Sequence, residues 1–127
     1  PDVSSAASDV YKRQELNGKL DGMAMRVPVP NGSVVDLVVE VEKEVTIDDI
    51  NNAVKNASEN ELKGILDYSD IPLVSTDILK NPHSSIYDAS STQILNNNHI
   101  KVVCWYDNEW GYSNRVVDLL EKLSKDE

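Results

Sequence analysis

The sequence predicts an α+β fold, in which helices lie on one face of a mostly antiparallel sheet. Three observations lead to this prediction. Strand-like segments follow one another with short turns between them, two segments carry helical periodicity, and 127 residues suffice for one core. Strands joined by short turns pair antiparallel, and amphipathic helices bury their apolar stripes against such a sheet.

The first predicted elements form a hairpin. Apolar and polar side chains alternate over residues 23–29, which predicts a strand. Asn31-Gly32 provides the turn chemistry of a β-hairpin, so we expect the second strand over residues 33–42. Every second residue of that strand is apolar and should line a buried face: Val35, Leu37, Val39 and Val41.

A helix is predicted next, beginning at Thr46 and ending near Glu59 or Asn60. Thr46 and Asp49 have the spacing of a capping box. The apolar residues that follow have helical spacing: Ile47, Ile50, Val54 and Ala57. A short apolar piece at Ile65-Leu66 then leads into a loop-rich stretch.

The last third of the chain predicts strands and one more helix. Residues 85–89 and 92–95 are expected to form two short strands, and residues 100–106 a third strand after a polar turn at 96–98. After Gly111, four apolar residues repeat at helical spacing and predict a terminal amphipathic helix: Val116, Leu119, Leu120 and Leu123.

Charge and motif content exclude several classes of function. The net charge of −10 disfavours binding to nucleic acid or to an anionic membrane. The single cysteine, Cys104, excludes an internal disulfide and favours the cytoplasm. His83 and His99 stand alone, so no metal site is predicted. Neither a GxGxxG motif nor a P-loop occurs.

The first fourteen residues are predicted not to belong to the folded domain. Residues 4–14 read SSAASDVYKRQ, which resembles the translation of a transposase-type sequencing adapter. We therefore expect residues 1–14 to be a non-native or disordered leader, and residues 15–127 to be the domain. A natural disordered linker is the alternative for the leader.

The most informative stretch is residues 104–117, which read CWYDNEWGYSNRVV. This stretch resembles a segment of the phosphorylating glyceraldehyde-3-phosphate dehydrogenases. The resemblance extends to GMAMRVP at residues 22–28, SVVDL at 33–37, LKGIL at 62–66 and SSIYDA at 84–89. Residues 15–127 are thereby identified as a partial catalytic domain of that family, including its C-terminal helix.

The resemblance implies a function for the whole enzyme. Glyceraldehyde 3-phosphate, NAD and inorganic phosphate would be converted to 1,3-bisphosphoglycerate in glycolysis, by a homotetramer. The family's reactive cysteine and its partner histidine should lie upstream, so the chain contains no catalytic residue and is expected to be inactive alone. The residues that choose NAD over NADP would also lie upstream, so both cofactors stay open.

Three residues match the family's binding positions. Arg26 matches the arginine that contacts the substrate phosphate, Asn108 the asparagine that binds the nicotinamide carboxamide, and Tyr112 a tyrosine near the nicotinamide. Each has a plainer alternative. Arg26 could lie on the wet face of a strand, Asn108 or Asp107 could cap the next helix, and Tyr112 could pack under that helix.

Three further expectations follow. Cys104 lies in an apolar strand, so we expect an inert core thiol rather than a nucleophile. Exposed apolar surface should make the chain aggregate when it is expressed alone. Two other functions remain as alternatives: a sister dehydrogenase acting on erythrose 4-phosphate, and a non-catalytic interaction or assembly domain.

Overall fold

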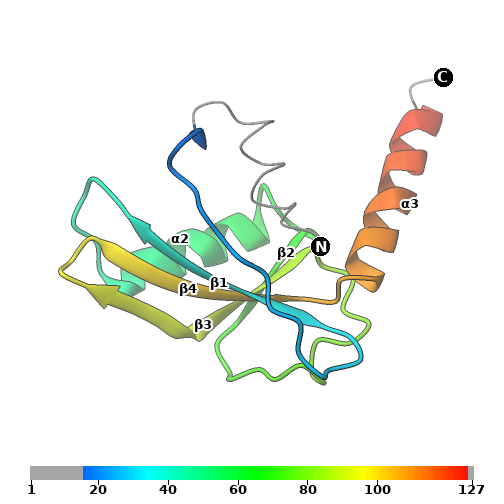
Figure 1. Cartoon of the computed structure of the whole chain (residues 1–127). Helices are drawn as coiled ribbons and strands as arrows, with labels where there is room; N and C mark the ends of the chain where they lie inside the picture. Colours follow the sequence, from blue (N-terminus) through cyan, green and yellow to red (C-terminus); the bar gives the residue numbers. More distant parts are fainter. Residues whose placement is uncertain (1–15, 126–127) are drawn as a thin grey trace.

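A computed structural model describes residues 16–125, which form an α+β fold of two helices and one four-stranded sheet (Figure 1). The predicted leader, residues 1–14, lies outside the described residues. The elements are β1 (Ser33–Glu40), α2 (Ile47–Glu59), β2 (Leu66–Ser69), β3 (Ser85–Leu95), β4 (His99–Tyr106) and α3 (Trp110–Lys125).

The sheet has the strand order β1-β4-β3-β2. β4 pairs antiparallel with β1 and with β3, whereas β2 runs parallel to β3. The prediction of a mostly antiparallel sheet is therefore confirmed. The strand β2 was anticipated only as a short apolar piece. Parallel pairing joins segments that are not linked by a turn, and local sequence does not reveal it.

β3 is one continuous strand, so the prediction of two short strands was wrong. The register shifts between Asp88 and Gln93, where a bulge interrupts the pairing with β4. The Asp88 carboxylate is buried and accepts hydrogen bonds from Ser90 N (3.1 Å), Ser90 Oγ (2.6 Å) and Ser91 Oγ (2.9 Å). These bonds hold the bulge inside the strand. The polar turn at residues 96–98 is confirmed, since it joins β3 to β4.

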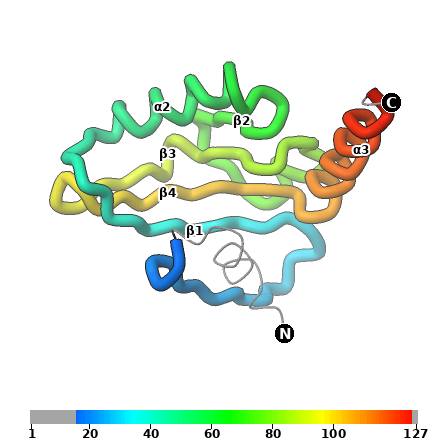
Figure 2. The backbone as a smooth tube through the Cα atoms, turned by 90° about the horizontal axis from the view of Figure 1, so that it is seen from above, coloured from blue at the N-terminus to red at the C-terminus, as the bar shows by residue number. Residues whose placement is uncertain are grey.

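α2 lies against β2 and β3 (Figure 2). Its predicted capping box is present: Asp49 N donates to Thr46 Oγ1 (3.1 Å), and Thr46 N donates to Asp49 Oδ2 (2.9 Å). The helix ends at Glu59, as predicted. The Tyr87 hydroxyl hydrogen-bonds to Asn51 Oδ1 of this helix (2.9 Å) and to Thr92 Oγ1 of β3 (2.6 Å). This polar cluster ties the helix to the bulged strand.

The first predicted strand is absent. Residues 23–29 form no strand, and Met23 and Met25 are 80% and 77% exposed. Pro28 and Pro30 have no N–H to donate to a ladder, and no neighbouring strand accepts this segment in the described structure. Asn31-Gly32 therefore makes a turn before β1, but it does not join two strands of a hairpin.

The apolar face predicted for β1 is largely uncovered. Val35 and Leu37 are 46% and 40% exposed, and only Val39 and Val41 are half-buried. The reason is that α2 covers β2 and β3 and does not reach the β1 edge of the sheet. α3 rises from the end of β4 (Figure 1). Its apolar stripe is exposed as well. The predicted exposed apolar surface is present.

Candidate functional site

The residues between β4 and α3 form a tight junction around Asp107. This carboxylate is only 2% exposed. Its Oδ1 accepts hydrogen bonds from Glu109 N (3.1 Å) and Trp110 N (2.9 Å), and its Oδ2 accepts one from Lys80 N (2.8 Å). The first two bonds cap the start of α3. The third ties the loop before β3 to the same carboxylate, so one side chain joins two distant segments.

The hydrogen bonds also set the charge of this group. Burial acts to raise the pKa of the Asp107 carboxyl. The backbone donors of Trp110, Lys80 and Glu109, together with the side chain of Asn31, outweigh burial, and the pKa lies below its usual value. Asp107 is therefore a fixed negative charge beside Asn108 at neutral pH.

The side chain of Asn108 is held against the turn before β1. Its Oδ1 accepts hydrogen bonds from Gly32 N (3.2 Å) and Ser33 Oγ (3.4 Å). A backbone N–H can only donate, so the amide atom that faces Gly32 has to be the oxygen. Asn108 Nδ2 makes no hydrogen bond within residues 16–125. The residue is exposed, and its amide can donate to a ligand.

Two glycines let the loop before β3 pack closely against the junction. Gly32 has φ +95°, and a Cβ there would lie 3.0 Å from Ile78 Cδ1. A Cβ on Gly111 would lie 3.0 Å from the carbonyl oxygen of His83. The loop before β3 therefore packs directly on both the turn and the first turn of α3. A larger side chain at either glycine would push these segments apart.

The other two predicted binding residues are exposed. Arg26 lies in the strandless segment before β1, and Tyr112, in the first turn of α3, is 73% exposed. No hydrogen bond or ion pair links either of them to Asn108 in the described part of the chain. Of the plainer alternatives, the cap of α3 belongs to Asp107 and not to Asn108. Tyr112 does not pack under the helix.

Cys104 lies within β4, where it pairs with Val35 on one side and Tyr87 on the other. It is half-buried. Burial raises the pKa of its thiol, and a hydrogen bond with Ser85 does not offset that effect. Because the thiolate is the nucleophilic form, a raised pKa makes this cysteine a poor nucleophile. The geometry supports the interpretation of Cys104 as a structural thiol.

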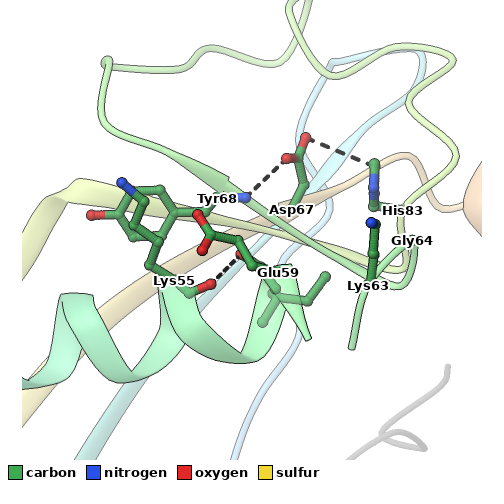
Figure 3. A pocket seen from close by; sticks show the side chains of 9 residues that line it. Lys55, Glu59, Lys63, Gly64, Asp67, Tyr68 and His83 are labelled. Atoms are coloured by element: carbon green, nitrogen blue, oxygen red, sulfur yellow. Dashed lines mark hydrogen bonds and ion pairs between the residues drawn. The ribbon is translucent and has the colours of Figure 1, made fainter. Parts of the chain in front are cut away.

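A separate hollow of about 550 Å³ lies between the end of α2 and β2 (Figure 3). Lys55 Nζ sits 5.7 Å from the centre of the Tyr68 ring, within the range of a cation–π interaction. On the opposite wall, His83 Nδ1 lies 2.7 Å from Asn81 Oδ1 and 3.8 Å from Asp67 Oδ2. None of the predicted binding residues lines this hollow. The backbone of His83 adjoins both the hollow and Gly111, and Arg115 of α3 donates to the carbonyl oxygen of Gly64 at the hollow (3.1 Å).

Residues 16–125 bring together no group of three His, Cys, Asp or Glu side chains that could hold a metal ion. Within the same residues, no helix combines the length and apolar character that crossing a membrane requires.

Sequence reasoning missed the residues that position Asn108. Gly32, Ser33 and Lys80 were not proposed as site residues, yet each contacts the junction. The Asn31-Gly32 turn was visible as a motif, but Asn108, to which Gly32 N donates, lies 76 positions further along the chain. Such a contact has no local signal in one sequence.

Comparisons with known proteins identify the family. The family model described as "Glyceraldehyde 3-phosphate dehydrogenase, C-terminal domain" matches residues 1–108. The chain is 58% identical over 111 residues to the glyceraldehyde-3-phosphate dehydrogenase of Mycolicibacterium smegmatis, covering 87% of this chain and 32% of that protein. It is 59% identical to that of Colletotrichum lindemuthianum and 60% identical to that of Priestia megaterium, covering 87% of this chain and 33% of each relative.

The chain thus spans about a third of the length of these relatives. It belongs to the glyceraldehyde-3-phosphate dehydrogenase family and corresponds to the C-terminal domain. The family named from the sequence is confirmed.

Proposed function

We propose that this chain is the C-terminal catalytic-domain part of an enzyme that converts glyceraldehyde 3-phosphate, NAD and inorganic phosphate to 1,3-bisphosphoglycerate. The observation that carries the proposal is the fixed amide of Asn108. Its oxygen is engaged by Gly32 and Ser33, and its nitrogen is left as an exposed donor. A primary amide held this way suits the carbonyl oxygen of a nicotinamide carboxamide.

The residues of the junction fit such a ligand. When bound, NAD supplies the acceptor for a hydride from the substrate. Asn108 would orient the nicotinamide by donating from Nδ2, while Asp107 keeps the backbone around Asn108 rigid. Tyr112 offers an exposed ring in the first turn of α3, four residues after Asn108. We assign both Asn108 and Tyr112 to cofactor binding, and the choice between NAD and NADP to residues outside this chain.

Arg26 would bind the phosphate of the substrate. Its guanidinium is exposed and makes no ion pair with residues 16–125. A planar guanidinium can contact two phosphate oxygens at once, which the ammonium of a lysine does not reproduce. We place the nucleophilic cysteine and its base in parts of the enzyme beyond these 127 residues, because Cys104 is a protonated thiol within β4. The chain alone is expected to be inactive.

The full enzyme is proposed to be a cytoplasmic homotetramer. The exposed apolar residues of β1 and α3 support assembly, because large uncovered apolar surfaces mark interaction sites. The same observation favours the rival function, a non-catalytic interaction domain. An activity measurement distinguishes the enzyme from the interaction domain.

The test joins residues 15–127 to the N-terminal part, about two thirds, of the Priestia megaterium relative. The chimera should reduce NAD with glyceraldehyde 3-phosphate and phosphate, and react more slowly with erythrose 4-phosphate. The reverse preference would assign the chain to the sister enzyme. A folded, tetrameric chimera without either activity would support the interaction-domain function.

Variants of the chimera test the individual residues. Asn108→Ala should lower kcat/KM for NAD about tenfold, the effect of one lost hydrogen bond to the ligand. Arg26→Leu should lower kcat/KM for the phosphorylated substrate about 10- to 100-fold, because a charged hydrogen bond is lost. Asn52→Ala, at an exposed position of α2, serves as the matched control and should change neither value.

A further inference from the structure

The chain contains two Asn-Gly pairs, Asn17-Gly18 and Asn31-Gly32, in contrasting surroundings. Both glycines have positive φ, +76° at Gly18 and +95° at Gly32. A Cβ on Gly18 would meet nothing within 4 Å, and Asn17 is exposed. A Cβ on Gly32 would meet Ile78 Cδ1 at 3.0 Å and the carbonyl oxygen of Ser75 at 3.3 Å. The first pair is open, and the second is packed.

Asn-Gly pairs are chemically labile, because glycine has no side chain to hinder attack by its backbone nitrogen on the preceding carboxamide. The nitrogen loses its proton and bonds to Cγ of the asparagine, and ammonia leaves as a succinimide ring forms. One water molecule then opens the ring to aspartate or isoaspartate. No oxidant, reductant or enzyme is needed.

The β4–α3 junction opposes this reaction at Asn31. The Gly32 N–H donates to two acceptors at once, Asn31 Oδ1 (2.8 Å) and Asn108 Oδ1 (3.2 Å). The attacking nitrogen has to give up that proton, and the bond to Asn108 Oδ1 holds the proton in place. Asn31 Oδ1 belongs to the carboxamide under attack, so the protection comes from Asn108. The side chain of Asn31 lies close enough to Asp107 to lower the pKa of that carboxyl, and the negative charge of Asp107 disfavours a second anion nearby. The space beside Gly32 is small, because a Cβ there would lie 3.0 Å from Ile78 Cδ1, and this leaves the turn little room to rearrange.

We propose that Asn31-Gly32 is a spontaneous deamidation site whose reaction the β4–α3 junction slows, while Asn17-Gly18 deamidates at the rate of an unprotected pair. Deamidation at Asn31 would weaken the junction. It places a second carboxylate beside the buried Asp107, and isoaspartate adds a methylene to the backbone of a turn with little free space beside Gly32. Asn108 would then lose the turn that holds its amide oxygen. The inference rests on the turn and its contacts with the junction, and it stands apart from the proposed enzymatic function.

The experiment follows both sites in the same molecule. The 127-residue chain is incubated at mildly alkaline pH and digested, and the deamidated peptides are quantified by mass spectrometry over time. Asn31 should convert about tenfold more slowly than Asn17, a ratio that corresponds to about 1.4 kcal/mol. In urea beyond the unfolding midpoint, the two sites should convert at similar rates. Equal rates in the folded chain would overturn the proposal.

Variants show whether the junction is responsible. Asn108→Ala removes one acceptor of the Gly32 N–H and should bring the rate at Asn31 toward that at Asn17. Ser33→Ala removes only the second donor to Asn108 and should have a smaller effect in the same direction.

Thr46→Ala is the matched control, since it weakens the cap of α2 without touching the turn. It should leave the ratio of the two rates unchanged. If Thr46→Ala accelerates deamidation at Asn31 as much as Asn108→Ala does, global unfolding sets the rate and the proposal fails. An unchanged rate at Asn31 in the folded Asn108→Ala variant would refute it as well.

Discussion

Replacing Asp107 by alanine removes the side chain on which the β4–α3 junction is built. The carboxylate is 2% exposed and accepts hydrogen bonds from three backbone N–H groups, those of Lys80, Glu109 and Trp110. Two of these groups belong to the start of α3 and one to the loop before β3. Asp107→Ala should therefore destabilise the chain at two places at once.

The expected loss follows from the two parts of the network. Replacing a helix N-cap by alanine costs about 1 kcal/mol. Losing the hydrogen bond from Lys80 N to a charged acceptor adds about 1.5–3 kcal/mol. The free energy of unfolding should fall by about 2.5–4 kcal/mol in total. A domain of this size has only about 5–15 kcal/mol, so the effect is large.

The assay is equilibrium unfolding in urea, followed by the fluorescence of Trp105 and Trp110 beside the junction. Asp107→Asn is the control, because asparagine caps helices well but has one carboxamide oxygen in place of two carboxylate oxygens. It should keep the cap of α3, lose the bond from Lys80, and cost about half as much as alanine. If Asp107→Ala costs less than about 1 kcal/mol, the three bonds do not stabilise the fold as argued.

Comparing the wild type with Asp107→Asn also tests whether Asp107 is charged. Its folded pKa lies below the usual value, so the unfolded chain binds the proton more tightly. The contribution to stability is complete above the unfolded pKa of about 3.9 and is lost as the pH falls through the lower folded pKa. The stability difference between the wild type and Asp107→Asn should therefore shrink in acid. A difference that is constant with pH would contradict this assignment.

Four further outcomes are expected. Thr46→Ala should lower the free energy of unfolding by about 1 kcal/mol through loss of the capping box, measured in the same urea assay. Gly111→Ala should lower the free energy of unfolding by about 1 kcal/mol net, since the new Cβ would lie 3.0 Å from the His83 carbonyl oxygen and this outweighs the gain in helix propensity. A more stable variant would show that the backbone moves apart to accommodate the Cβ. Cys104 should react slowly with iodoacetamide at neutral pH and faster in urea, because burial raises the pKa of its thiol; equal rates would argue against burial. Leu120→Lys should reduce self-association of the chain in sedimentation, because Leu120 is 62% exposed on α3; unchanged association would locate the contact elsewhere.

The sequence predicted the elements whose signals are local. The cap of α2 follows from two residues three positions apart, Thr46 and Asp49, and the structure has that box. The polar turn at residues 96–98 works because Asn96 and Asn97 tolerate positive φ, at 53° and 63°. In both cases the responsible atoms lie within one turn of the chain.

The failed predictions concern partners that are distant in sequence. Residues 23–29 alternate like a strand, but alternation says nothing about whether a neighbouring strand exists to pair with. Likewise, the apolar face of β1 was expected to be buried, and Val35 and Leu37 remain exposed because α2 lies over the other half of the sheet. The site shows the same division. Asn108 was identified from a family motif, whereas its contacts with Gly32 and Ser33 depend on the tertiary fold.

The packing of the junction contrasts with that of the surfaces around it. The apolar stripe of α3 is uncovered, yet Asp107 and Gly111 at the start of the same helix are buried. The junction is buried because it hydrogen-bonds to two loops of the same chain, one at Gly32 and one at Lys80. The exposed stripe has no such partner in the described residues. Changes to the exposed stripe should therefore affect solubility and association first, while Asn108 keeps its orientation as long as Asp107 holds the start of α3.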